Sequence, residues 1–171
     1  MGRYLLLFCK IIVLVLLQVW VFSPLYVFRL ATPFPYIYIL FLLPINVSKM
    51  GITLWSALSG LLLDILSGTP GLHMAAFTAT GFLRSYLLPL FVDADTDGSY
   101  PPSLAVGGWG IALLLLILTA FHHTLLFLLD AVGAFDFPYF LLRLGTSIVA
   151  TYILTLVCLL LLGYRPRKRR G

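Results

Sequence analysis

Residues 60–84, with the sequence GLLLDILSGTPGLHMAAFTATGFLR, decide the fold, because two apolar runs meet there at a short polar elbow. The elbow, SGTPG at 67–71, is rich in glycine and proline, which stop helices and permit a tight reversal. The runs on either side are too apolar for the surface of a small soluble protein. The stretch therefore predicts two membrane-spanning helices that turn back on each other.

The composition extends this prediction to the whole chain. Of its 171 residues, 61% are hydrophobic and only 10% are charged, so the bilayer must solvate most of the surface. The formal net charge is +5, but five of the eleven basic residues lie within the last seven positions rather than on a folded basic face. Nucleic acid is therefore not an expected partner, and residues 1–171 are expected to form a single transmembrane domain.

Six apolar runs are expected to cross the membrane, which makes the fold an all-α, polytopic membrane protein. The second run is shorter than the ~20 residues of a usual crossing and carries Pro35 and Pro44, so a re-entrant segment is the alternative. Tyr36 and Tyr38 suit an aromatic belt at the headgroups, which favours a crossing. The expected helices cover residues 4–23, 34–47, 51–66, 72–91, 109–130 and 139–162, followed by a basic tail at 163–171.

The basic residues orient the chain, because cytoplasmic ends of membrane helices carry an excess of Lys and Arg. Arg3, Lys49 and the five cations of the tail would face the cytoplasm, whereas Arg29 and Arg143 lie at outer ends. Both termini are therefore expected in the cytoplasm and the elbow outside. Arg84, about 18 Å beyond the elbow by helical rise, is expected to extend to the opposite surface.

Asp64 and His73 flank the elbow that contains Gly71, so both ionisable groups fall near one bilayer surface. Polar groups at membrane depth are costly unless they are buried in protein or reach an interface, which makes these residues candidates for a site. The alternative is that Asp64 accepts hydrogen bonds from the elbow backbone and His73 fills a gap between helices. This structural interpretation is preferred, since intramembrane polar residues often serve packing.

Further ionisable groups lie in the last two expected helices. His122 and His123 occupy the middle of the fifth, Asp130 its end, and Arg143 the start of the sixth. A structural ion pair between Asp130 and Arg143 is preferred over a ligand site. The adjacent histidines point about 100° apart on a helix, and the chain has neither HExxH nor any Glu. We therefore expect no metal site, no cofactor and no enzyme activity.

An acidic segment before the fifth helix matches half of a calcium-binding loop. Asp93, Asp95 and Asp97 take the first, third and fifth positions and Gly98 the sixth. The twelfth position holds Leu104 where a bidentate Glu should close the coordination. A solvated turn is therefore the preferred interpretation of this segment.

A transport role is the other functional class that such residues permit. Chains of Asp and His form proton relays in transporters, but six helices with no evident repeat between the two halves argue against alternating access. A small-molecule-binding membrane subunit of a transporter, with an outward pocket, fits the size of the chain. It stands as the alternative function.

The elbow and its flanks carry a resemblance to a known family. Asp64 is followed by SGTPGLH at 67–73, GLLL at 60–63 precedes it, and an Ala-containing helix runs on through FLR at 82–84. This pattern resembles the signature of the rod shape-determining protein MreD. Further similarities to one branch of that family are the connection ATP at 31–33, the aromatic segment 34–44 and the histidine pair of the fifth helix.

The resemblance implies a non-catalytic subunit of the bacterial elongation machinery in the inner (cytoplasmic) membrane, with a role in cell shape and lateral-wall peptidoglycan synthesis. Such proteins are similar in outline to the substrate-binding subunits of energy-coupling-factor transporters. They associate with MreC, hence with the actin-like MreB and the peptidoglycan synthase. Gly60, Gly81, Thr78 and Gln18 would then offer close packing to a partner's single helix, and the tail would meet anionic lipids or an acidic partner surface.

Overall fold

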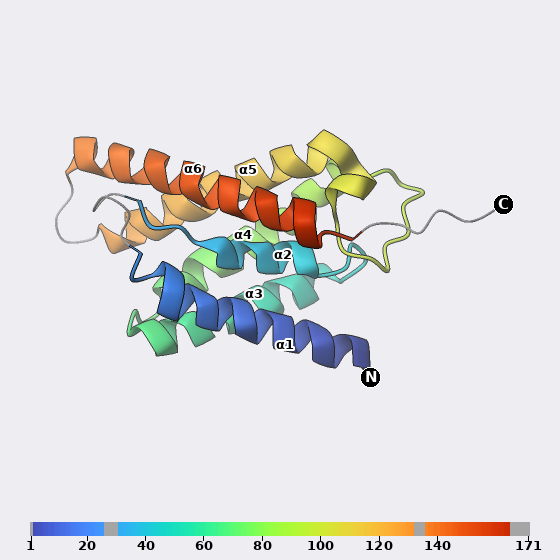
Figure 1. Cartoon of the computed structure of the whole chain (residues 1–171), viewed down its shortest axis with the longest axis horizontal. Coiled ribbons are helices and arrows are strands. Elements are labelled where there is room, and N and C mark those ends of the chain that lie inside the picture. Colours follow the sequence, from blue (N-terminus) through green and yellow to red (C-terminus); the bar gives the residue numbers. More distant parts are fainter. Residues whose placement is uncertain (1, 26–30, 132–135, 165–171) are drawn as a thin grey trace.

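The computed structural model describes residues 2–25, 31–131 and 136–164, which form one bundle of helices along a common long axis (Figure 1). The α-helices are α1 (Gly2–Leu17), α2 (Ile39–Leu42), α3 (Lys49–Ser67), α4 (Leu72–Leu87), α5 (Leu104–Asp130) and α6 (Phe137–Leu162). A π-helical turn, η1 (Gln18–Phe22), extends α1. The 3₁₀ turn η2 (Pro35–Tyr38) precedes α2, and the 3₁₀ turn η3 (Leu88–Leu90) extends α4.

Within the described residues, four helices are long and apolar enough to cross a membrane, namely Leu5–Phe22 of α1 with η1, and the helices α3, α5 and α6. The expected all-helical, multi-pass character is therefore confirmed, with four helices of crossing length where six were expected. The run expected over 72–91 divides into α4, which has 16 residues, and the short turn η3.

The bundle has two ends, which we term the elbow end and the loop end. The elbow end holds the turn between α3 and α4 and the start of α6, as Figure 1 shows. The loop end holds the acidic loop 92–103, the starts of α1 and α3 and the end of α6. The start of α1 and the end of α6 therefore lie at the same end of the bundle, the loop end.

Glycines make the elbow between α3 and α4. Gly68 ends α3 in the left-handed region with φ of 68°, and its N–H donates to the carbonyl of Asp64. Gly71 precedes α4 with φ of 82°. Left-handed backbone at both positions lets the chain reverse within a few residues, as the sequence predicts.

Two other glycines allow α3 and α4 to pack closely. A Cβ atom on Gly60 would lie 2.6 Å from the Cα of Met74, and one on Gly81 would overlap the side chain of Ser56. The two backbones approach more closely than a side chain at either position would allow. Gly60 and Gly81 thus serve packing inside the chain, and the expectation that they pack against a partner is wrong.

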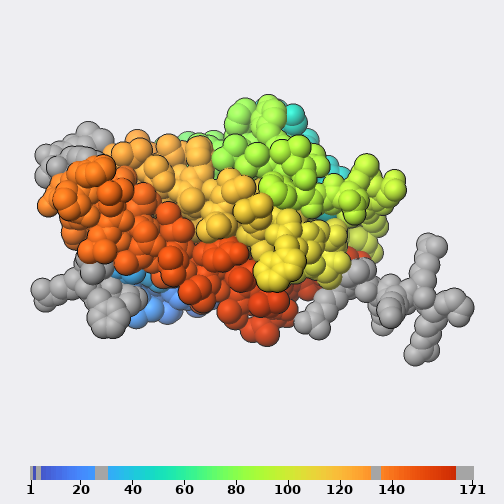
Figure 2. Space-filling view, turned by 90° about the horizontal axis from the view of Figure 1, so that it is seen from above, coloured from blue at the N-terminus to red at the C-terminus, as the bar shows by residue number. Residues whose placement is uncertain are grey.

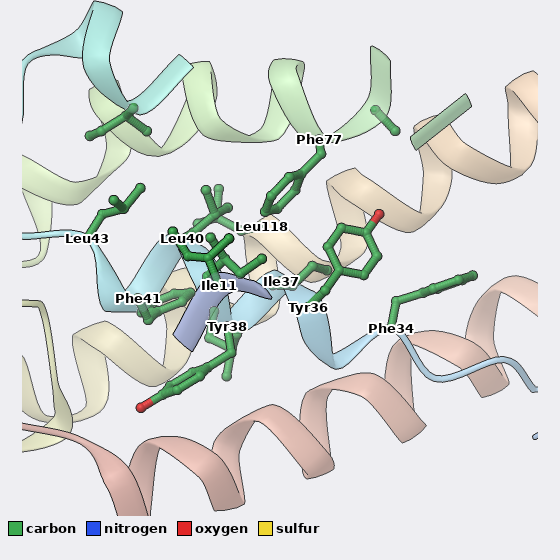
Figure 3. Close-up of a cluster of buried hydrophobic side chains, with 14 of the residues drawn as sticks. Ile11, Phe34, Tyr36, Ile37, Tyr38, Leu40, Phe41, Leu43, Phe77 and Leu118 are labelled. Atoms are coloured by element: carbon green, nitrogen blue, oxygen red, sulfur yellow. The ribbon is translucent and has the colours of Figure 1, made fainter. Parts of the chain in front are cut away.

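Residues 31–43, which we term the central segment, run through the centre of the bundle, as Figure 1 shows for α2 and the chain before it. Every residue from 31 to 41 is buried. Figure 3 shows that Phe77 of α4 reaches toward this segment, which forms one hydrophobic cluster with side chains from α1, α4 and α5. Tyr36 and Tyr38 are 0% and 3% exposed, so the aromatic belt expected for them is wrong.

The helix expected over 34–47 is also wrong, and proline explains why. Pro35 starts a single 3₁₀ turn, and α2 ends at Leu42. Leu43 is extended, with ψ of 133°, because the residue before a proline avoids the helical region and Pro44 follows it. The prolines therefore leave two short helical turns, which neighbouring helices rather than lipid surround.

The loop end is joined by backbone hydrogen bonds. After α2, the N–H of Ile45 donates to the carbonyl of Tyr100 at 3.0 Å, and the N–H of Asn46 donates to the carbonyl of Gly98 at 2.9 Å. The acidic loop itself is a series of turns that lasts until α5 begins at Leu104. The central segment is thereby anchored at the end opposite the elbow.

Arg84 does not extend to the surface as expected. Its side chain is 0% exposed, and Nη2 donates to the carbonyl oxygen of Leu43 at 3.0 Å. The chain after α2 and the chain after η3 both lie near the last turn of α4, where they line one cavity together with Arg84. Position along a helix gives the depth of a side chain but says nothing of what covers it, so the expectation for Arg84 is wrong.

The helices α5 and α6 lie side by side along one face of the bundle (Figure 2). α5 begins at Leu104, before the expected 109, and bends at Gly108, whose φ is 53°. α6 begins at Phe137, before the expected 139, because the carboxylate of Asp136 accepts the N–H of Tyr139 at 3.2 Å and caps the helix.

Much of the charge used for orientation lies outside the described residues. Arg29 falls within 26–30, and the five cations of the tail fall within 165–171. Lys49 is described and begins α3 at the loop end. The cytoplasmic placement of both termini therefore stays a prediction from the sequence.

Candidate functional site

Tyr36 is the hub of a buried hydrogen-bond network at the centre of the bundle. Its hydroxyl oxygen lies 3.0 Å from Nδ1 of His73 on α4 and 2.6 Å from Nε2 of His122 on α5. The three side chains are 0%, 6% and 0% exposed, respectively. The central segment thus brings together two of the predicted candidates, which lie 49 positions apart in the sequence.

The partners of this network fix where its protons lie. The Thr80 hydroxyl donates to the carbonyl of Ala76 at 2.7 Å, so its oxygen accepts the bond from Nδ1 of His122 at 3.2 Å. His122 then carries its proton on Nδ1, and its Nε2 accepts from the Tyr36 hydroxyl. The Tyr36 oxygen in turn accepts from Nδ1 of His73. Each donor is matched by an acceptor with both imidazoles neutral.

His123 makes a separate connection, from α5 to α6. Its Nδ1 donates to the carbonyl of Thr119 at 2.8 Å, and its Nε2 accepts from the Thr151 hydroxyl at 3.0 Å. The Thr151 oxygen also accepts the N–H of Phe34 at 2.9 Å. The two adjacent histidines, which point in different directions on the helix, therefore hold two different neighbours of α5.

Side chains supply the hydrogen bonds that the extended backbone before η2 lacks. Ser147 and Thr151 of α6 accept the N–H groups of Thr32 and Phe34 at 3.1 and 2.9 Å. Alternate residues of an extended chain are about 6.6 Å apart, and residues four apart on a helix are about 6 Å apart. The spacing of the two backbone N–H groups therefore matches the spacing of the two hydroxyls on α6. Unsatisfied backbone groups inside a membrane protein are very costly, and this match removes two of them.

Gln18 completes the support of this backbone from the other side. Its Nε2 donates to the carbonyl oxygen of Pro33 and to the hydroxyl of Ser23, both at 3.3 Å. Gln18 is 0% exposed, so the expectation that it offers packing to a partner protein is wrong. It binds the central segment to η1 instead.

Asp64 caps α4 from the preceding helix. Its Oδ1 accepts the hydroxyl of Thr69 and the backbone N–H of His73, and its Oδ2 accepts the N–H of Met74, all at 2.9 Å. The carboxylate is thus held by three donors and faces the positive end of the α4 dipole. The structural interpretation of Asp64, acceptance of hydrogen bonds from the elbow backbone, is confirmed.

Aromatic rings fill the space around the histidines. The Phe34 ring lies 5.7 Å from that of His73 and 5.3 Å from that of His123, measured between centroids. Phe34 also lies 6.2 Å from Phe127 of α5. The space beside His73 is therefore filled by Phe34 and by Tyr36, whose ring lies 5.7 Å away.

Asp130 and Arg143 form the ion pair that the sequence predicts. Arg143 Nη1 lies 2.7 Å from Asp130 Oδ2 and joins the end of α5 to the start of α6. The guanidinium also lies over the ring of Phe127, 4.3 Å from its centroid. The side chains of Arg143 and Asp130 are 25% and 42% exposed, respectively, so this pair lies at the surface.

This arrangement joins helices. Within residues 2–25, 31–131 and 136–164, no three His, Cys, Asp or Glu side chains lie close enough to hold a metal ion. His122 and His123 each use both ring nitrogens in hydrogen bonds within the chain. The network therefore ties the central segment to α4, α5 and α6.

Several members of the network escape sequence reasoning. The sequence predicts an interfacial position for Tyr36, assigns no role to Phe34, and indicates only a packing position for Thr80 in an apolar helix. One signal was available in α6, where Ser147, Thr151 and the buried Thr155 recur every four residues on one face of an otherwise apolar helix.

Comparison with known proteins adds no relative to this description. No family model, no curated protein and no solved structure matches the chain.

Proposed function

We propose that this chain is a non-catalytic, MreD-like subunit of the bacterial elongation complex, which lies in the cytoplasmic membrane and binds the transmembrane helix of an MreC-like partner. One observation carries the proposal. At the elbow end, the Asp64 carboxylate and the Tyr36 hydroxyl both find their hydrogen-bond partners within the chain, while α4 leaves an apolar groove open beside them. A chain of this kind is suited to bind a helix rather than to carry out a reaction.

The same proposal includes six crossings, as in the substrate-binding subunits of energy-coupling-factor transporters. α4 with η3 amounts to 19 residues, about 28 Å at helical rise. Residues 31–46 are bonded to the middle of α6 through Ser147 and Thr151, and to the acidic loop at the loop end, which supports a crossing by this segment too. The positive-inside rule then puts the loop end and both termini in the cytoplasm.

The α4 groove, with a volume of about 640 Å³, is the surface we assign to the partner helix. Ala75, Thr78 and Ala79 line its floor, between Thr53 of α3 and Phe121 of α5. Small residues let a second helix approach closely, and close packing drives helix association in membranes. The Thr78 hydroxyl donates to the carbonyl of Met74 at 2.6 Å, so it brings no unpaired donor to the groove.

Disulfide crosslinking in membranes tests this assignment. With Cys9 and Cys158 replaced by Ala, single cysteines at Ala79 and at Val149 are oxidised against cysteines placed along the helix of the MreC-like protein. Val149 is the control, because it lies on α6 and is 57% exposed. We expect crosslinks at Ala79 and none at Val149.

Equal crosslinking at the two positions, or crosslinking at Val149 alone, would contradict the groove assignment.

Native mass spectrometry of the purified chain distinguishes the MreD-like function from that of a small-molecule-binding transport subunit. Retention of an unidentified small molecule, together with no association with the MreC-like protein, would favour the transport subunit instead.

A further inference from the structure

A cavity of about 310 Å³ lies at the loop end, between the start of α3, the end of α4 and the acidic loop. A cavity of this size has room for several water molecules. Its lining includes Lys49, Ile52, Arg84, Ser85, Val92 and Asp93.

Arg84 belongs to the lining of this cavity, and its buried guanidinium has hydrogen-bond donors without a partner among the described residues. A guanidinium carries five N–H donors and no acceptor. Nη2 of Arg84 donates to the carbonyl of Leu43, whereas Nε and Nη1 are buried and have no partner among the described residues. Buried polar groups in proteins are nearly always hydrogen-bonded, and an unpaired buried charge is especially costly. The guanidinium therefore needs an acceptor that the folded chain does not supply.

The charges around the cavity favour an anion as that acceptor. Lys49 brings a second cation, and its ammonium lies 3.9 Å from the ring centroid of Tyr86. Asp93 is the one carboxylate that lines the cavity, and it forms no ion pair with Arg84 within 4.0 Å. Two cations thus face one exposed carboxylate, which leaves a net positive site.

We propose that this cavity binds a phosphate group, with Nε and Nη1 of Arg84 donating to its oxygens and Lys49 at the entrance. Arginine suits this task because its planar donors match phosphate oxygens and its charge is permanent. The cavity lies at an end of the bundle, where the headgroup of an anionic phospholipid and a free phosphate ion can both reach it. The proposal does not depend on the elongation complex, because the chain alone forms the site.

Thermal unfolding of the purified full chain in nanodiscs tests the site. One arm adds phosphatidylglycerol to phosphatidylcholine discs, and the other adds inorganic phosphate to discs of phosphatidylcholine alone. We expect the unfolding midpoint to rise in at least one arm, and the apparent affinity to fall about tenfold or more in Arg84→Met. A rise with phosphatidylglycerol only identifies a lipid headgroup, and a rise with phosphate identifies a free ion.

Two further variants keep the test decisive. Arg143→Met removes a cation at the elbow end and is the matched control, so it should respond to the anion as the unmodified chain does. Asp93→Asn removes the competing carboxylate and should bind phosphate more tightly, which gives a result even where Arg84→Met does not fold. The proposal is overturned by midpoints that neither anion raises, by an equal loss of response in Arg143→Met, or by weaker binding in Asp93→Asn, which would make Asp93 the partner of Arg84.

Discussion

The two ends of the bundle differ in how the most buried charged side chain of each end, Asp64 or Arg84, is hydrogen-bonded. At the elbow end, the carboxylate of Asp64 accepts three hydrogen bonds, and the Tyr36 hydroxyl lies within hydrogen-bond distance of two imidazoles. At the loop end, Arg84 is just as buried but has one partner, and two of its nitrogens have none among the described residues. Asp64 is thus fully hydrogen-bonded within the chain at the elbow end, whereas two nitrogens of Arg84 at the loop end stay unpaired in the part of the chain that the structure describes.

The difference separates a structural role from a binding role. A polar network whose members all pair within the chain fixes the positions of its helices and offers nothing to a ligand. A buried cation with spare donors beside a cavity is stable only with an outside acceptor or with water. Asp64, His73 and His122 are thus hydrogen-bonded within the chain, whereas Arg84 is the residue for which we propose a binding role.

The largest effect expected at the elbow end is that of Asp64→Leu. The change leaves the hydroxyl of Thr69 and two N–H groups of the first turn of α4 without an acceptor, and it should lower the free energy of unfolding by about 3–5 kcal/mol. Denaturation in mixed detergent micelles measures it. Asp64→Asn keeps one oxygen acceptor, so its free energy of unfolding should fall clearly less than that of Asp64→Leu.

Because Asp64 holds the elbow beside the α4 groove, Asp64→Leu should also weaken recovery of the MreC-like protein in pull-downs. An unfolding free energy equal to that of the unmodified chain would show that the cap is dispensable. The hydrogen bonds of Asp64 would then add no stability at the elbow end, and the proposed difference between the two ends would be contradicted.

Tyr36→Phe is expected to have the next largest effect. Loss of the hydroxyl leaves Nδ1 of His73 and Nε2 of His122 buried without a partner, which should cost about 1–3 kcal/mol of stability. Tyr38→Phe is a matched control, since Tyr38 is also buried but its hydroxyl makes no hydrogen bond among the described residues. The same unfolding measurement should find little change there, and equal losses in the two variants would remove Tyr36 as the hub.

The elbow could be predicted from the sequence because its causes are local. Gly68 and Gly71 adopt the left-handed conformations that only glycine adopts readily, and Asp64 lies one turn before them with its carboxylate in reach of the next helix. The apolar lengths of α3, α5 and α6 were equally readable, since a crossing helix needs only length and hydrophobicity.

The central segment and Arg84 could not be predicted, because their environment comes from distant parts of the chain. An apolar run between prolines looks the same whether lipid or protein surrounds it, and the hydroxyls that support this one lie more than 100 positions away. Arg84 is buried by turns that follow other elements, and neither periodicity nor depth along α4 indicates that cover. The sequence therefore indicated His73 and His122 as polar candidates but did not indicate Tyr36, whose hydroxyl bonds to both.

The smallest expected effect belongs to Arg143→Met, which removes the one ion pair among the described residues. Asp130 is 42% exposed and Arg143 25%, so solvent screening should limit the loss to at most about 1 kcal/mol, and added salt should reduce the difference further. Methionine keeps apolar contact with Phe127, which isolates the charge from the packing. Unfolding of the variant and of the unmodified chain at low and high salt measures both the loss of stability and its dependence on salt. A loss above about 2 kcal/mol that persists in high salt would mean that lipid shields the pair. In that case the elbow end would depend on charge as much as on its neutral network, and the two ends would differ less than the hydrogen bonds indicate.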